Sequence, residues 1–136
     1  MEPDVGRLTV LVADDAAEVA RQLGELLAEA GARVVATASD GAEALRLFDQ
    51  TAPDAVVLDI EMPRLNGLEV LKAIRTSHSS PGRRPLVIMM TMHDEPAWRE
   101  QCLAAGADHF LHKGSEFERL LKILPAYCAL RGAAPL

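Results

Sequence analysis

Two hydrophobic patterns alternate along the sequence. Short, nearly continuous apolar runs are typical of strands, whereas apolar residues that recur every three or four positions are typical of amphipathic helices. The run at 86–91 is the most apolar, and the run at 108–113 is flanked by polar residues. Five strands are predicted in this way, at residues 8–13, 33–38, 54–59, 86–91 and 108–113.

Helical segments follow each of these runs. They are predicted at residues 16–31, 41–50, 67–76 and 95–106, and from Ser115 onward. Pro96 suits a first helical position, and Gly106 is a stop signal for the same helix. Ser115 and Glu118 match the S-x-x-E capping box, which predicts the start of the last helix. Pro125 interrupts that last pattern, so we expect a kink or a stop there.

The regular alternation of strands and helices predicts the fold class. Strands with near-continuous apolar runs are usually buried on both faces, as in a parallel sheet. Right-handed crossovers then place helices on both sides of the sheet. We therefore expect an α/β domain with a doubly wound, five-stranded parallel sheet of flavodoxin-like type and strand order 2-1-3-4-5. The more polar strands at 33–38 and 108–113 suit the sheet edges.

Composition and charge narrow the possible functions. The 136 residues fit one domain, and 49% of them are apolar. The formal net charge of −6 argues against binding to nucleic acid or to an anionic membrane, since both need a positive surface. No segment approaches the ~20 apolar residues of a membrane span, and the first residues do not resemble a signal peptide. A cytoplasmic protein is expected.

Polar residues stand at four predicted strand ends. The carboxyl ends of parallel strands meet at one edge of a doubly wound sheet, where ligands usually bind. The sequence therefore gathers five side chains at that edge. They are Asp14, Asp15, Asp59, Thr91 and Lys113.

Phosphoryl chemistry would use all five of these side chains. Three close carboxylates repel one another unless a proton or a cation joins them, and Mg²⁺ suits such oxygen ligands. Lys113 supplies a positive charge and Thr91 a hydroxyl group for phosphoryl oxygens. Asp59 is then placed to accept the phosphoryl group as a nucleophile. An Asp-Asp pair alone is more often a loop or a cap, and Asp15 could cap the first helix; only the joint pattern favours a site.

Four segments together resemble the receiver domain of two-component response regulators. They are VADDA (12–16), LDIEMPRLNG (58–67), MMT (89–91) and AGADHFLHK (105–113). Each is unspecific alone, but the combination is highly specific and covers about residues 7–124. The resemblance implies a single receiver domain over residues 1–136 with the receiver fold. Residues 1–6 and 130–136 are expected to be flexible.

The resemblance also implies roles for the strand-end residues. Asp59 would be the phospho-acceptor, and it would receive its phosphoryl group from a sensor histidine kinase or a histidine phosphotransfer protein. Asp14 and Asp15 would hold Mg²⁺ together with Asp59 and the backbone carbonyl of Glu61. Such a domain catalyses only its own phosphorylation and dephosphorylation, so we do not expect an enzyme that acts on other substrates.

A conformational switch is the output that the resemblance implies. Thr91 would move toward the phosphoryl group, Lys113 would pair with it, and Phe110 would fill the space that Thr91 vacates. The surface formed by the fourth helix, the fifth strand and the fifth helix would change shape as the population shifts between two states. A downstream protein partner, an output domain in a longer chain or a phosphorylation-dependent dimer would read this change.

Four residues depart from the family pattern or stand near the site. Gly114 replaces a proline that usually follows the lysine, so we expect a less fixed turn. Met92 stands where a small residue is usual and is expected to slow the entry of small phosphoryl donors. Glu61 lies beside the route of hydrolytic water and is expected to affect the lifetime of the phosphorylated form. His93 is a candidate modulator of phosphate loss.

Two alternative functions use the same residues. One is a Mg²⁺-dependent phosphohydrolase with an aspartyl nucleophile, although we see no general acid and no substrate cap in the sequence. The other is a pseudo-receiver that docks to partners without being phosphorylated, although the five-residue set is intact. No output domain is visible, which fits either a single-domain regulator or part of a longer chain.

Overall fold

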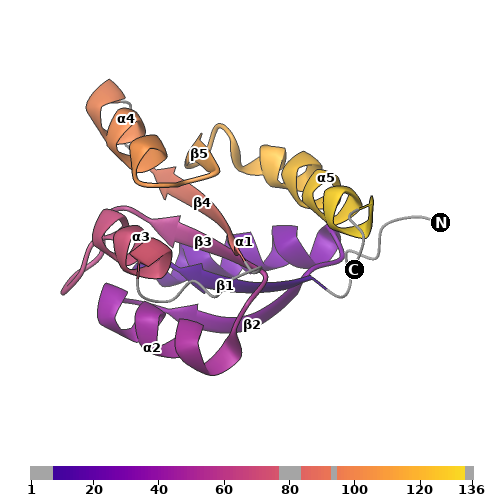
Figure 1. Cartoon of the computed structure of the whole chain (residues 1–136), viewed down its shortest axis with the longest axis horizontal. Coiled ribbons are helices and arrows are strands. Elements are labelled where there is room, and N and C mark those ends of the chain that lie inside the picture. The colour runs from indigo at the N-terminus through magenta and orange to yellow at the C-terminus, as the bar shows by residue number, and fades with distance from the viewer. Residues whose placement is uncertain (1–7, 77–83, 93–94, 134–136) are drawn as a thin grey trace.

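A parallel five-stranded sheet forms the centre of the molecule, with helices on both faces (Figure 1). The structure is a computed structural model, and it describes residues 8–76, 84–92 and 95–133. The strand order is β2-β1-β3-β4-β5, and all four neighbouring pairs are parallel. The predicted doubly wound α/β fold and its strand order are therefore confirmed.

Strands and helices alternate as the sequence predicts. The strands are β1 (Thr9–Ala13), β2 (Arg33–Ala38), β3 (Ala55–Asp59), β4 (Leu86–Thr91) and β5 (His109–His112). The helices are α1 (Ala17–Glu29), α2 (Gly41–Thr51), α3 (Gly67–Thr76), α4 (Pro96–Ala104) and α5 (Leu120–Ala133). A short 3-10 helix, η2 (Phe117–Arg119), precedes α5.

The sheet divides the apolar core into two clusters. Successive side chains of a strand point to opposite faces, so Val56 and Leu58 pack on the side of α2, α3 and α4, while Ala55 and Val57 pack on the side of α1 and α5. Every residue of β3 and β4 is buried, as expected for central strands covered on both faces. The strands β2 and β5 form the edges, where predicted, and include partly exposed residues.

The predicted start of the last helix is wrong. Ser115 and Glu118 do not form a capping box, because η2 begins after Glu116 and has no side-chain cap. Gly114, with φ +85°, turns the chain back toward β5. The Glu116 side chain therefore accepts a hydrogen bond from the backbone N–H of His112 at 2.8 Å.

Two further expectations concern helix ends. Pro125, where we expected a kink or a stop, lies inside α5, which continues to Ala133, so the stop is excluded. Residues 130–133 belong to this helix. Asp15 does not cap α1, because the N-cap is Ala16, whose N–H is bound by Asp14 Oδ1 at 2.9 Å.

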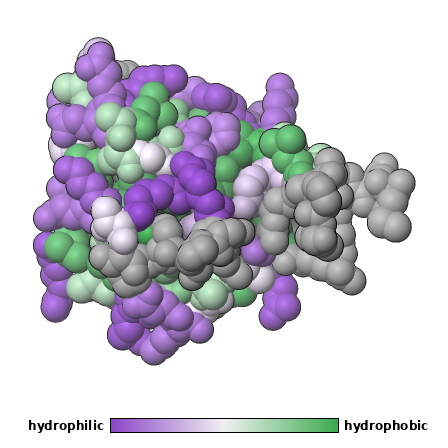
Figure 2. Space-filling model, in the orientation of Figure 1, coloured by the Kyte–Doolittle hydropathy of each residue, from purple (hydrophilic) through white to green (hydrophobic). Residues whose placement is uncertain are grey.

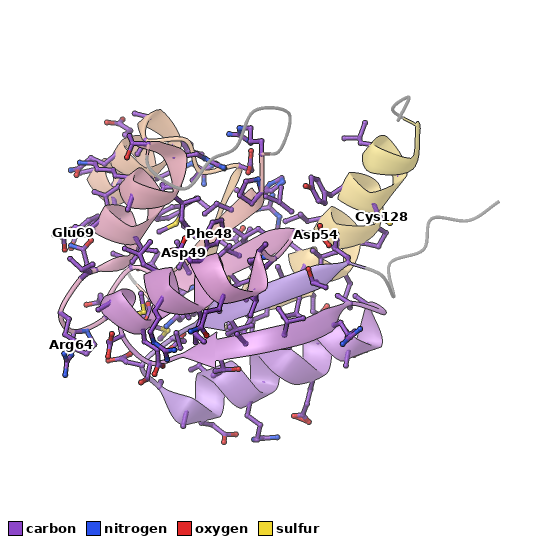
Figure 3. The ribbon with its side chains drawn as sticks, turned by 60° about the horizontal axis from the view of Figure 1, so that its bottom comes forward. Phe48, Asp49, Asp54, Arg64, Glu69 and Cys128 are labelled. Atoms are coloured by element: carbon purple, nitrogen blue, oxygen red, sulfur yellow. The ribbon has the colours of Figure 1, made fainter. Side chains whose placement is uncertain are left out.

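The turn between β3 and α3 is packed closely against its neighbours. Gly67 N–H donates to the carbonyl oxygen of Ile60 at 2.8 Å. Arg64 points away from the domain, with 74% of its side chain exposed (Figure 3). Its Nε forms an ion pair with Oδ2 of Asp40, at the start of α2, over 3.5 Å. Asn66 and Glu69 exchange backbone-to-side-chain hydrogen bonds of 2.9 Å each and so cap α3. These contacts fix the loop that follows the last residue of β3.

The described surface shows no sign of a membrane span. Among the residues that the structure describes, no helix combines the length and the apolar character needed to cross a bilayer. In the view of Figure 2, hydrophilic residues surround separate apolar patches. Cys102 is fully buried, and burial raises the pKa of its thiol to about 11.

Replacing Gly67 by alanine should destabilise the fold by about 1–3 kcal/mol, the usual cost of overpacking. A Cβ atom at Gly67 would lie 2.2 Å from the carbonyl oxygen of Asp59, so the backbone must shift. Urea unfolding measures the change. Gly24→Ala in α1 is the matched control, because a Cβ atom there meets nothing within 4 Å, and it should stabilise the helix by up to about 1 kcal/mol. Equal stabilities for the two variants would contradict this account.

Candidate functional site

Four buried polar side chains meet at the carboxyl edge of the sheet. Asp14 directly follows β1, Asp59 ends β3, Thr91 ends β4, and Lys113 directly follows β5. Their exposed fractions are 2%, 3%, 1% and 7%, respectively. In the part of the chain that the structure describes, these are the four buried polar or charged residues. These side chains are far apart in the sequence, and they meet because the carboxyl ends of parallel strands lie at one edge of the sheet, which we call the strand-end rule.

Lys113 links two of the carboxylates. Its Nζ lies 2.7 Å from Oδ2 of Asp14 and 3.0 Å from Oδ1 of Asp59. A buried ion pair is tolerated only where the geometry is close and the remaining polar atoms find partners. The ammonium group therefore compensates the charge that the two strand ends bring into the domain.

A third carboxylate leaves the site open on one side. Oxygens of Asp14, Asp15 and Asp59 all lie within 4.8 Å of one another, and Asp15 is exposed. Oδ2 of Asp14 is buried and, apart from the ion pair with Lys113, has no hydrogen-bond partner in the described part of the chain. Three hard oxygen donors, one of them reachable from solvent, fit the ligand preference of Mg²⁺.

Burial dominates the protonation of Asp59. It raises the pKa of this carboxyl group from 3.8 to about 6, and the nearby charge of Asp14 adds to the rise. Lys113 and the N–H of Glu61, 3.2 Å from Oδ1, act in the opposite direction. Burial also favours the neutral amine of Lys113, but its contacts with Asp14 and Asp59 outweigh this and raise its pKa. At neutral pH Lys113 is therefore a cation, and it lies between the carboxyl groups of Asp14 and Asp59.

Thr91 and Phe110 lie on the β4–β5 side of the site. Thr91 pairs with His112 in the parallel ladder, and its carbonyl oxygen accepts a hydrogen bond of 2.7 Å from the N–H of Lys113. Phe110 is already buried, with 9% exposed, in the core cluster that includes Cys102 of α4. The ring therefore occupies an inward position in this structure.

The expected modulators differ in their surroundings. Met92 directly follows Thr91 and is 61% exposed. The side chain of Glu61 is also exposed. His93 lies outside the described residues. In the turn after Lys113, which we expected to be less fixed because of Gly114, the N–H of Glu116 donates to the carbonyl oxygen of His112 at 3.0 Å.

A hollow of about 170 Å³ adjoins the carboxylates and was missed by the sequence reasoning. Asp14 and Asp15 line it together with three polar residues. These are Thr37 of β2, Ser39 directly after β2, and Glu43 of α2. Applying the strand-end rule to β2 as well would have found Ser39, which directly follows that strand.

Replacing Asp59 by asparagine should remove a pH-dependent cost in metal-free protein. Because the folded-state pKa is raised to about 6, the native protein binds more protons than the unfolded chain between about pH 4 and 6, and its free energy of unfolding falls as the pH rises through this window. The free energy of unfolding of Asp59→Asn, taken relative to that of wild type, should therefore increase by on the order of 2–3 kcal/mol as the pH rises from about 4 to 7. Urea unfolding with a chelator measures this, and a difference independent of pH would contradict it.

Comparison with known proteins identifies the family. The sequence profile described as "Response regulator receiver domain" matches residues 10–125. The response regulator MprA of Mycobacterium sp. (strain KMS) is 40% identical over 126 residues, and the transcriptional regulatory protein PrrA of Mycobacterium leprae (strain TN) is 38% identical over 133 residues. These alignments cover 93% and 98% of this chain but only 52% and 55% of the relatives. The chain thus spans about half the length of these relatives.

Solved structures agree with the sequence relatives. The signal receiver domain of the response regulator NarL from Mycobacterium tuberculosis has a TM-score of 0.80 and 32% identity, covering 90% of this chain and 97% of that chain. A CheX–CheY complex with beryllofluoride and magnesium from Borrelia burgdorferi has a TM-score of 0.77 and 26% identity, covering 88% of each chain. The profile match over residues 10–125 and the relatives of 38–40% identity show that the chain belongs to the receiver domains of two-component response regulators.

Proposed function

We propose that Asp59 accepts a phosphoryl group from a phosphorylated histidine of a partner protein. Receiver domains of this family interact with histidine kinases and are generally signalling modules rather than enzymes. The observation that carries the proposal is the position of Asp59, a strand-end carboxylate that is buried beside a second carboxylate and neutralised by Lys113. A carboxylate oxygen of Asp59 attacks phosphorus, the P–N bond breaks, and the imidazole leaves with the bonding electron pair.

Asp14, Asp15 and Asp59 are the residues that would hold Mg²⁺, with the backbone carbonyl of Glu61 as the further ligand that the family resemblance implies. Bound there, Mg²⁺ supplies positive charge for the phosphoryl oxygens. The fit rests on the three close carboxylates and on the buried Asp14 oxygen, whose partner in the described part of the chain is the ammonium group of Lys113.

Lys113 and Thr91 stabilise the product in this proposal. Lys113 is 3.0 Å from Oδ1 of Asp59, so its ammonium group can move onto a phosphoryl oxygen while it keeps its contact with Asp14. The hydroxyl group of Thr91 then donates to another phosphoryl oxygen. Phe110, which is buried with 9% exposed, then fills the space that Thr91 vacates.

The surface formed by α4, β5 and α5 is the proposed output. Helix α4 carries the half-buried Trp98 and the exposed Leu103, which is 41% exposed. A hollow of about 570 Å³ on the other side of β5 is lined by Ile123 and Tyr127 of α5 together with charged side chains, among them Arg84, Asp108 and Lys122. A downstream protein, an output domain in a longer chain or a second phosphorylated copy would bind here, and the two named relatives are about twice as long as this chain.

Intact mass should detect the phosphoryl group directly. With Mg²⁺ and either acetyl phosphate or a phosphorylated histidine protein, wild type should gain the mass of one phosphoryl group, and Asp59→Asn should gain none because it lacks the nucleophile. Asp49→Asn is the control, since Asp49 is an exposed aspartate on α2 (Figure 3). Turnover of external phosphoesters would favour the phosphohydrolase, and no gain from either donor would favour the docking module.

Met92 should limit the entry of small donors. Met92→Ala shortens the exposed side chain next to Thr91, so the phosphorylation rate with acetyl phosphate should rise by about two- to tenfold, or roughly 0.4–1.4 kcal/mol of barrier. Val34→Ala, at an exposed apolar residue of β2, should leave this rate unchanged. An unaltered rate for Met92→Ala would remove Met92 as a modulator.

Glu61 and His93 are the other proposed modulators. Because the N–H of Glu61 donates to Asp59, its exposed side chain starts close to the acceptor. Glu61→Gln and Glu61→Asn should change the rate of dephosphorylation, and rates equal to wild type for both would exclude this role. The same assay with His93→Ala tests whether that histidine affects phosphate loss.

A further inference from the structure

His112 on β5 joins two loops at the edge of the sheet. Its Nε2 lies 3.0 Å from the carbonyl oxygen of Met92, the first residue after β4. Its Nδ1 lies 2.9 Å from Oγ of Ser115, in the turn after β5. The imidazole thus bridges the two chain segments that leave the sheet beside the proposed phosphoryl site.

The partners of the ring define its tautomer. The carbonyl oxygen of Met92 can only accept, so Nε2 of His112 must carry a hydrogen and donate it. In the neutral imidazole, Nδ1 then accepts a hydrogen bond from the hydroxyl group of Ser115. Both ring nitrogens are therefore used, and the ring orientation is fixed from two sides.

The backbone of His112 is held as well. Its N–H donates to Oε1 of Glu116 at 2.8 Å, and its carbonyl oxygen accepts from the N–H of Glu116 at 3.0 Å. Arg119 holds the other carboxylate oxygen of Glu116 at 2.9 Å. Gly114 allows this return of the chain, because its φ of +85° lies in the left-handed region that favours glycine. The turn after Lys113 is therefore closed around His112.

The two bridged segments carry the residues proposed to bind the phosphoryl group. Met92 directly follows Thr91, and His112 directly precedes Lys113. The same segments are joined a second time by the 2.7 Å hydrogen bond from the N–H of Lys113 to the carbonyl oxygen of Thr91. A shift of the backbone after Thr91 would have to stretch the imidazole contact.

We infer that His112 is a positioning residue, whose Nε2–H contact with Met92 couples the backbone of Thr91 to that of Lys113 so that both reach a phosphoryl group together. The inference rests on the proposed phosphorylation of Asp59. It assigns His112 no contact with the phosphoryl group itself. The residues of this coupling come from β4, β5 and the turn after β5.

Beryllofluoride with Mg²⁺ is a suitable probe, because it mimics an aspartyl phosphate without a donor protein. Trp98, the single tryptophan of the chain, is half-buried on α4, and its fluorescence together with intact mass is used to follow binding. His112→Gln places an amide N–H near the position of Nε2 and keeps a donor for Met92. His112→Asn places its amide near Nδ1 and is too short for Met92, and His112→Phe keeps a ring without either nitrogen.

The affinity of the three variants for beryllofluoride should depend on whether the new side chain keeps a hydrogen-bond donor for Met92, and not on the size of that side chain. His112→Asn and His112→Phe should weaken beryllofluoride binding about three- to tenfold, the usual effect of one lost neutral hydrogen bond. His112→Gln should bind within about twofold of wild type, since it keeps that bond. His109→Gln and His109→Asn are matched controls at the start of the same strand and should bind like wild type. Urea unfolding of every variant separates a loss of stability from a loss of affinity.

Each outcome has a distinct meaning. Failure of wild type to bind beryllofluoride would remove the proposed function of Asp59, whatever the variants do. If wild type binds and His112→Asn binds equally well, His112 is not a positioning residue. Equal weakening in His112→Gln and His112→Asn would also overturn the inference, because the Met92 contact would then not be the cause. If His112→Phe does not fold, the Gln–Asn pair alone decides the result.

Discussion

The ammonium group of Lys113 between two buried carboxylates is the interaction on which this edge of the domain depends. Asp14 and Asp59 are brought within reach of one cation because β1 and β3 are neighbours and both end there. Without the cation, two unscreened negative charges would face each other in a buried place, which proteins rarely tolerate. Burial still raises the pKa of Asp59 to about 6, so the compensation is incomplete. The site thus retains a capacity for further positive charge.

The parallel sheet explains how such a cluster can exist at all. A strand ending in a carboxylate is costly alone, but β3 and β4 are buried along their whole length and hold their last residues rigidly. The two apolar clusters on either side of the sheet stabilise the strands independently of the charged edge. The stability of the fold can therefore come from the two apolar clusters, while the reactive groups lie at the carboxyl edge of the sheet.

Sequence reasoning predicted the sheet order and the side chains at the strand ends because both follow from simple periodicity and topology. Asp59 and Lys113 were found in this way, by where their strands end. The start of the last helix was wrong because Gly114 reverses the chain first, and a backbone conformation of that kind is not visible in a capping pattern. The hydrogen bonds of His112 were missed because they depend on the spacing of two loops. The inward ring of Phe110 depends on core packing, which no local pattern reports.

The close packing around Gly67 has a mechanical consequence. A Cβ atom at Gly67 or Gly41 would meet backbone atoms of Asp59 and Leu65 at 2.2 and 2.1 Å, so the loop after β3 has a stiff wall on the side of α2 and α3. On the other flank, Met92 is largely open to solvent, and its carbonyl oxygen contacts the imidazole of His112. The carboxyl edge of the sheet is thus stiffer on the side of α2 and α3 than on the side of β4 and β5.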